Sequence, residues 1–294
     1  MKVSIIGAGR LGGALAIALS KKGFEIENLA ARKLPKAERI AEFIEPRPKI
    51  IRSNEFSEIA SDVIFITTQD SEIAAVAQKL KADLSHQPIV FHTSGALSSD
   101  VLKDLKLNGC RVASFHPLIS VSDAGRGAEK FANAYFCVEG DAEAVAVGEE
   151  IARELGGNSF AIETKFKTLY HASAVTACGH LVALVDAAIE MLTKCGLPER
   201  EAQKVLLPLI KSTVENLETQ TTAESLTGTF ARADVSTLEK HLETLRENVP
   251  AEILEIYLLL GLRSIPLAEK QGADKMKLAE ISDKLLLAKK NLKC

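Results

Sequence analysis

Apolar residues in the first half of the chain come in short runs that alternate with longer amphipathic stretches. The runs lie at residues 3–6, 25–31, 63–66, 89–91, 112–115 and 135–138. Stretches such as SEIAAVAQKL and AEAVAVGEEIARELG repeat their apolar residues with a helical period. This alternation predicts an α/β fold, a Rossmann-type doubly wound parallel sheet with ligands beyond the carboxyl ends of its strands.

The pattern changes after a last short strand predicted at residues 159–162. From there a helical pattern continues almost to the end, with breaks near Gly196-Leu197-Pro198, Thr227-Gly228 and Val249-Pro250. The 294 residues also suit two domains of ordinary size. We therefore expect a nucleotide-binding domain over residues 1–162 and an all-helical domain over residues 163–294.

The first predicted strand runs into Gly7-Ala8-Gly9-Arg10-Leu11-Gly12, and an apolar helix follows. This is the GxGxxG pattern in the strand-to-helix context that dinucleotide binding requires. Gly7 would permit the tight turn, Gly9 would let the backbone approach a pyrophosphate, and Gly12 would let the helix pack on the strand. The alternative is a glycine turn with a structural role alone.

The end of the second predicted strand indicates which dinucleotide is bound. An NAD-binding protein usually offers an acidic residue there, about 20 residues after the glycine motif, to the ribose hydroxyls. Here the strand ends in AARK, so Arg32 and Lys33 stand where the acid is expected. Cations would attract a 2′-phosphate, which favours NADP(H). The alternative is a pair of solvated surface cations.

Polar residues follow three further predicted strands. Thr67 and Thr68 come after the first of them and could touch the cofactor; Ser94 and Gly95 follow the next, and His116 the third. We take the last three residues as candidates for substrate contacts, with Ser94 and His116 also as catalytic candidates. A metal site made of His92, His116 and His171 is a weaker alternative, because the sequence offers neither a carboxylate ligand nor HxxxH spacing.

The stretch KTLYHASAVTACGH carries a lysine and two histidines in a sequence otherwise suited to a helix core. On one helix over residues 164–195, Lys167 and His171 are four residues apart and share a face, whereas His180 points about 180° away from His171. A lysine beside a cleft could stabilise the charge that develops during hydride transfer. The alternative is a surface lysine beside a structural histidine.

Composition narrows the function classes. Hydrophobic residues make up 47% and charged residues 26% of the chain, and the net charge of −3 gives no reason to expect nucleic acid as a partner. Five cysteines without a CxxC pair suggest neither disulfides nor a zinc site. We see no secretory signal and no apolar run of about 20 residues, so we expect a cytoplasmic protein without a membrane partner.

The segments GAGRLGGALA, FHTSGAL, SFHPLISVSD, KTLYHASAVTACGH and LTGTFARADVSTLEKHL together resemble uncharacterised bacterial Rossmann-like NADP oxidoreductases whose C-terminal domain is a domain of unknown function. More distantly the layout resembles the 6-phosphogluconate dehydrogenase superfamily, with ketopantoate reductase, pyrroline-5-carboxylate reductase and prephenate dehydrogenase. Lys167 matches the lysine of that superfamily's KxxxN motif, but His171 stands at the Asn position. The resemblance implies a homodimer packed through the helical domain and makes Arg232 a candidate for a substrate carboxylate.

These observations predict an NADP(H)-dependent oxidoreductase that acts on a small carbonyl or imine compound with a carboxylate. Lys167 would be the acid or electrostatic stabiliser, His171 and His116 would orient substrate or relay a proton, and Ser94 would contribute a hydroxyl. Two alternatives remain open: a non-catalytic NADP(H) sensor and a deazaflavin-dependent NADP reductase.

Overall fold

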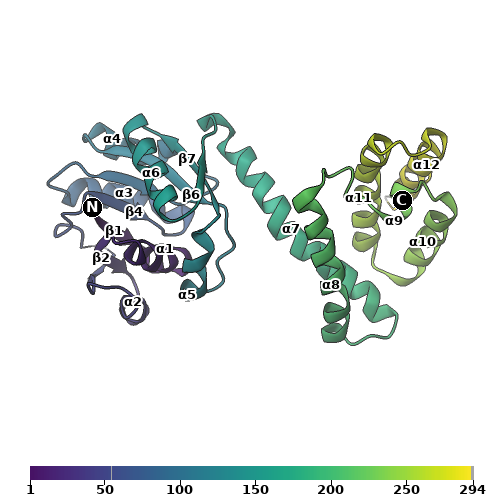
Figure 1. Ribbon diagram of the computed structural model, residues 1–294, viewed down its shortest axis with the longest axis horizontal. Coiled ribbons are helices and arrows are strands. Elements are labelled where there is room, and N and C mark those ends of the chain that lie inside the picture. The colour runs from purple at the N-terminus through teal and green to yellow at the C-terminus, as the bar shows by residue number, and fades with distance from the viewer. Residues whose placement is uncertain (54, 293–294) are drawn as a thin grey trace. The chain divides into compact units, whose positions relative to one another are not determined.

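The computed structural model describes residues 1–53 and 55–292, so Cys294, one of the five cysteines, lies outside the described residues. The chain divides into two compact units, Met1–Cys178 and Gly179–Cys294. The first contains a sheet with helices on both faces, and the second is helical (Figure 1). The prediction of a Rossmann-type α/β domain followed by an all-helical region is confirmed.

The sheet of the first unit has eight strands in the order β3-β2-β1-β4-β5-β6-β7-β8. The strands are β1 (Lys2–Ile6), β2 (Glu25–Ala31), β3 (Lys49–Arg52), β4 (Val63–Ile66), β5 (Ile89–His92), β6 (Arg111–Pro117), β7 (Tyr135–Gly140) and β8 (Asn158–Phe160). The order places β1 next to β4, which is where a doubly wound sheet binds its ligand.

One pairing departs from the predicted parallel arrangement. β6 and β7 pair antiparallel, with His116 opposite Cys137, and β8 then pairs parallel to β7. The connection from β6 to β7 contains two helical segments of four residues each, α5 (Ala124–Gly127) and the 3₁₀ helix η2 (Ala128–Phe131). This connection has no long crossover helix to return the chain to the amino end of β6. β7 therefore starts at the carboxyl end of β6 and runs in the opposite direction.

Helices cover both faces of the sheet. They are α1 (Arg10–Lys21), α2 (Leu34–Ala41), α3 (Asp70–Asp83), α4 (Lys103–Leu107) and α6 (Ala142–Glu154), with 3₁₀ helices η1 (Ser99–Leu102) and η3 (Thr164–Phe166). Apolar residues of α1, α2 and α6 share one core with the sheet, and those of α3 and α4 share the other. The two cores make the sheet a rigid platform for the residues at its edges.

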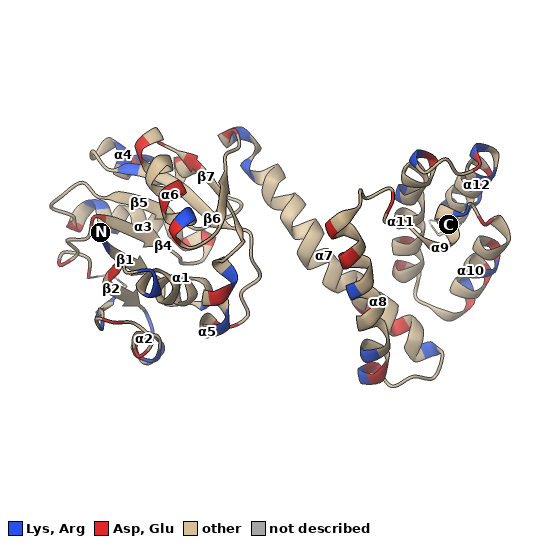
Figure 2. Cartoon of the chain, viewed as in Figure 1, with Lys and Arg blue, Asp and Glu red and all other residues tan. Residues whose placement is uncertain are grey.

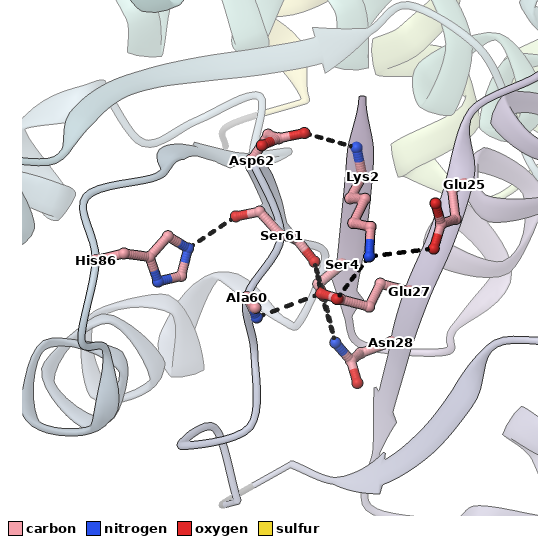
Figure 3. A network of polar contacts seen from close by, with 9 residues as sticks. All are labelled: Lys2, Ser4, Glu25, Glu27, Asn28, Ala60, Ser61, Asp62 and His86. Carbon is pink, nitrogen blue, oxygen red and sulfur yellow. Dashed lines mark hydrogen bonds and ion pairs between the residues drawn. The ribbon is translucent and has the colours of Figure 1, made fainter.

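A polar network lies at the amino ends of β1 and β2 (Figure 3). The side chains of Ser4, Asn28 and Ser61 are buried, and Asn28 donates to the Ser4 hydroxyl, which lies 2.6 Å from that of Ser61. Ser61 in turn donates to Glu27, which also pairs with Lys2. Since its buried polar groups have partners, the network stabilises the scaffold at the edge opposite the glycine loop.

The second unit is built from helices. After α7 (Lys167–Lys194), which begins in the first unit, come α8 (Glu199–Thr219), α9 (Gly228–Ala231), α10 (Val235–Asn248), α11 (Ala251–Lys270) and α12 (Lys275–Asn291). Leucines and isoleucines of α10, α11 and α12 form its core. The carboxylates of Asp234 and Asp274 accept backbone hydrogen bonds at the starts of α10 and α12, as N-caps do.

Helix α7 is unusual in its apolar surface. No Lys, Arg, Asp or Glu lies between Lys167 and Asp186, and Figure 2 shows its middle turns without charge colours. By length and composition, the stretch Thr164–Lys194 could cross a membrane. This differs from the expectation of no apolar run of spanning length. One such helix is weak evidence for a membrane span, and its first turn packs against the sheet through the buried Lys167.

Candidate functional site

The glycine loop joins β1 to α1. Gly7 has φ +116°, a conformation that L side chains rarely adopt, and a Cβ on Gly12 would overlap the Gly7 carbonyl oxygen and the Thr67 hydroxyl. The Thr67 hydroxyl donates to the Gly7 carbonyl at 2.7 Å and so holds the turn against β4. A Cβ on Gly9 would meet nothing within 4 Å, so open space lies beside this residue at the start of α1.

A cavity of about 980 Å³ lies beside this loop. Most of the predicted cofactor residues line it, namely Gly7, Ala8, Gly9, Arg32, Lys33, Thr67 and Thr68. Arg10 lies on a neighbouring cavity of about 420 Å³, and Leu11 lines neither. Lys36 and Lys79 also line the larger cavity, and the sequence analysis did not single them out.

The cavity suits a nucleotide with an extra phosphate. Arg32 and Lys33 follow the end of β2, and Arg32 pairs with Glu72 at 2.6 Å, with 69% of its own side chain exposed. Such an exposed pair is weak, so Arg32 can exchange partners. The Thr68 hydroxyl oxygen is buried without a hydrogen-bond partner among the described residues, which leaves a polar group available to a ligand. The residues therefore fit NADP(H).

His92, at the end of β5, has both ring nitrogens engaged within its own loop. Nε2 lies 3.1 Å from the Ser98 carbonyl oxygen, and Nδ1 accepts from the backbone N–H of Ser94. The ring is fully buried, and burial, with a contribution from the nearby Lys167 charge, lowers the pKa of His92 to about 3. His92 is thus a neutral structural residue of the loop.

Ser94 supports the same loop with its side chain. The hydroxyl oxygen accepts from the backbone N–H groups of Ala96 and Leu97, and 5% of the residue is exposed. The hydroxyl hydrogen is still available for a further acceptor. The catalytic role predicted for Ser94 stays a prediction.

The rings of His116 and His171 lie against Gly95, and Tyr170 lies beside His116. The His116 Nδ1 lies 2.7 Å from the Tyr170 hydroxyl, and the rings of His116 and His171 pack edge to face with centroids 6.2 Å apart. A Cβ on Gly95 would lie 2.6 Å from His171 Cδ2 and 2.7 Å from His116 Nε2, so a glycine is needed for this approach. Burial, followed by the charges of Lys167 and His171, lowers the pKa of His116 to about 4.

Lys167 lies behind these rings and is 2% exposed. Its ammonium donates to the buried Cys137 thiol at 3.7 Å and lies 5.3 Å from the centroid of the Tyr170 ring. Burial lowers the pKa of Lys167, while Cys137 and Glu139 oppose that shift. The lysine is therefore placed to act on the site through its neighbours.

Glu139 is the acid behind Lys167. The carboxylate is buried and accepts from the Ser99 backbone N–H at 2.8 Å, the Ser99 hydroxyl at 2.9 Å and the Thr164 hydroxyl at 3.1 Å. These donors satisfy the buried carboxyl group and join β7 to η1 and η3.

The structure thus brings together His116, His171, Gly95 and, behind them, Lys167, all in the first unit. Arg232 follows α9 in the second unit and is exposed, and His180 is exposed on α7. Among residues 1–53 and 55–292, no cluster of three or more His, Cys, Asp and Glu side chains could hold a metal ion.

Sequence reasoning missed three members of this site. Tyr170 could have been found, because it lies three residues after Lys167 and thus on the same side of the helix. Cys137 and Glu139 gave no comparable signal, because they reach His116 and Lys167 only through the antiparallel pairing of β6 and β7.

Two family models match the chain, and the border between them lies between β6 and β7. Residues 1–117 match the family model of a Rossmann-like domain, in line with the sheet of the first unit. More narrowly, residues 134–264 match a domain of unknown function, DUF2520, so the chain combines these two domains. A search of curated proteins found no significant match.

Solved structures support the fold over most of the chain. A protein from Thermotoga maritima is 26% identical, with a TM-score of 0.74 over 92% of this chain and 99% of that one. A protein from Bacteroides fragilis named "putative NADP oxidoreductase" is 24% identical, with a TM-score of 0.71 over 90% and 97%. A pyrroline-5-carboxylate reductase from Coxiella burnetii is 15% identical, with a TM-score of 0.59 over 93% and 98%.

Proposed function

We propose that the chain is an NADP(H)-dependent oxidoreductase that reduces a small carbonyl or imine compound carrying a carboxylate. The observation that carries the proposal is the cavity beside the glycine loop, with Arg32 and Lys33 where an NAD-binding protein would offer an acid. The glycine loop and the start of α1 would hold the pyrophosphate, and the two cations would hold the 2′-phosphate.

Two structural neighbours support the cofactor and the reaction class. A pyrroline carboxylate reductase from Plasmodium falciparum was solved with NADP bound, and a reductive aminase from Aspergillus terreus with NADPH. Each is 15% identical to this chain, so the likeness lies in the fold. Both names describe reduction at a C=N bond, which is why imines stand beside carbonyl compounds in the proposal.

The side chains near Gly95 are the ones that would assist hydride transfer. The reduced nicotinamide would supply a hydride, after which charge or a proton demand develops on the substrate oxygen or nitrogen. His116 and His171 are half-buried and would face that atom, while the Lys167 charge would stabilise it from behind. Ser94 would add its hydroxyl, and Arg232 remains the candidate for the substrate carboxylate because its exposed guanidinium can bind in a bidentate manner.

Lys167→Met tests the role of the lysine. The thioether fills much of the same space without the charge, so we expect a kcat about 100-fold lower and an unchanged affinity for NADPH. Steady-state kinetics with a substrate found by screening would measure this. A kcat equal to that of the wild type would remove Lys167 from the mechanism.

The first experiment is titration of the protein with NADPH and NADH, before and after Arg32→Asp. We expect NADPH to bind more tightly and the substitution to weaken it about tenfold to a hundredfold, the range of a charge-assisted hydrogen bond, with little effect on NADH. Lys22→Asp is the matched control, because Lys22 caps the far end of α1, about 18 Å along the helix. Binding of neither nucleotide would overturn the proposal.

The two alternatives have their own tests. A sensor would bind NADPH without transferring hydride, so exchange of label from a deuterated cofactor into product distinguishes it from an enzyme. A deazaflavin-dependent reductase would oxidise NADPH when a deazaflavin is added and would not need a carbon substrate. The His116 and His171 pair favours catalysis over sensing, since a sensor has no use for two imidazoles placed to face a substrate.

We also propose a homodimer in the cytoplasm. Large apolar side chains on α7 and α8 are exposed, among them Leu169, Val182, Val205 and Leu209. Apolar surface of this extent on two helices indicates an interface, and a second copy of the chain is the partner we propose. Sedimentation at micromolar concentration tests it.

A further inference from the structure

The two ring nitrogens of His116 have different surroundings. Nδ1 lies 2.7 Å from the Tyr170 hydroxyl, whereas the Nε2 edge is turned toward Gly95, 2.7 Å from where a Cβ would be. A neutral imidazole carries one N–H, and the partner of one nitrogen decides what the other can do. The partner of Nδ1 therefore determines the hydrogen bond that His116 offers at Gly95.

Both partners are in their neutral forms at physiological pH. Burial raises the pKa of Tyr170, with Cys137 adding to the shift, so the phenol keeps its hydrogen. Burial and the Lys167 charge lower the pKa of His116 to about 4, so the ring has a free lone pair on one nitrogen. The Tyr170 hydroxyl also has the Cys137 thiol as a hydrogen-bond neighbour. A thiol sulfur is a weaker acceptor than an imidazole nitrogen, so the phenol hydrogen is left for His116.

The direction of this hydrogen bond follows from the chemistry of the pair. An imidazole nitrogen is a stronger acceptor than a phenol oxygen, and a phenol is a strong donor. Lys167 reinforces this choice, because a cation 5.3 Å from the centroid of the Tyr170 ring stabilises the partial negative charge that the oxygen gains when it donates. Tyr170 then donates to Nδ1.

We propose that Tyr170 is a positioning residue that fixes His116 in the tautomer with its proton on Nε2, so that a neutral imidazole presents an N–H beside Gly95 at the carboxyl end of β5. The importance of this N–H for turnover rests on the proposed function. The opposite tautomer would present a lone pair there and suit a substrate that donates, such as an alcohol.

The tautomer suggests the substrate class. A carbonyl oxygen or an imine nitrogen is an acceptor, so an Nε2–H can bind it before hydride transfer and stabilise negative charge on it afterwards. A neutral imidazole serves this purpose without placing a second full charge next to Lys167. His116 is therefore arranged to bind the oxidised form of the substrate, a carbonyl or an imine.

Nitrogen NMR of the protein labelled with ¹⁵N-histidine tests the assignment without any nucleotide or substrate. We expect the His116 ring at pH 7 to show a protonated Nε2 and an unprotonated, hydrogen-bonded Nδ1. In Tyr170→Phe the Nδ1 signal should move to that of a nitrogen without a donor, and the second tautomer should appear. Tyr135→Phe is the matched control, because Tyr135 is 55% exposed on β7.

Two results would overturn the proposal: a protonated Nδ1 in the wild type, or identical His116 signals in the wild type and Tyr170→Phe. The wild-type spectrum alone decides the tautomer even where the variant folds poorly. Because the measurement needs no cofactor, its failure is separate from a failure to bind NADPH. With a substrate in hand, Tyr170→Phe should lower kcat about tenfold and leave the KM for NADPH unchanged.

Discussion

Two buried histidines should make the first unit sensitive to acid. His92 and His116 have pKa values of about 3 and about 4 in the folded chain, against 6.5 for an ordinary histidine. Between pH 6.5 and these values the unfolded chain binds more protons than the folded chain. The stability that the two neutral histidines contribute is therefore fully present above pH 6.5 and is lost as the pH falls toward their folded-state pKa values.

The size of the effect follows from the pKa differences. Each histidine costs about 1.4 kcal/mol of stability for every pH unit below 6.5, up to about 5 kcal/mol for His92 and about 3 kcal/mol for His116. The free energy of unfolding of a domain is usually about 5–15 kcal/mol, so the combined loss from the two histidines is comparable to the total stability. We expect the first unit to unfold near pH 4–5 at room temperature.

Urea unfolding followed by circular dichroism between pH 4.5 and 7.5 measures the loss, with hydrogen exchange in β4 and β5 assigning it to the sheet. His92→Gln should lower stability at pH 7 by about 1–2 kcal/mol, because the Ser94 N–H loses its acceptor. It should also halve the slope of stability against pH. His180→Gln, at an exposed site on α7, is the control. An acid slope as steep in His92→Gln as in the wild type would refute the reasoning.

Three further predictions concern single positions. Gly12→Ala should abolish nucleotide binding in a titration, because its Cβ overlaps a backbone oxygen of Gly7 that cannot move aside. Gly95→Ala should push the His116 ring away, lower the free energy of unfolding by about 1–3 kcal/mol in urea and shift the ¹⁵N signals of that ring. Val182→Glu should convert the proposed dimer to a monomer in sedimentation, since it buries a charge in the interface; an unchanged mass would place the interface elsewhere.

Local patterns allowed much of the sheet to be predicted. Runs such as residues 63–66 are apolar throughout because both faces of a central strand are buried. β3 (Lys49–Arg52) was missed, since its ends are charged and one of its four residues is buried. The glycine motif was recognisable because Gly7 needs its positive φ and Gly12 its close approach to the Gly7 carbonyl, and both requirements lie within the motif itself.

The site was harder to predict because its contacts are long-range. Helical spacing placed Lys167 and His171 on one face, but it gave no indication that Lys167 is buried against Cys137. That contact depends on the antiparallel pairing of β7 with β6, which no local sequence pattern predicts. The strand-end position of His92 resembled that of His116, although one ring is engaged within its own loop and the other reaches Tyr170.

The antiparallel pairing of β6 and β7 also limits how the two halves can be recombined. The Rossmann-like match ends at residue 117, in β6, and the DUF2520 match begins at residue 134, just before β7. A chimera joined between them would have to rebuild this strand pair from two parents, and either half alone would present an unpaired strand edge. His116 would also meet a foreign Tyr170 and Cys137. Exchange of substrate preference between relatives should therefore succeed only when both sides of this strand pair are transferred together.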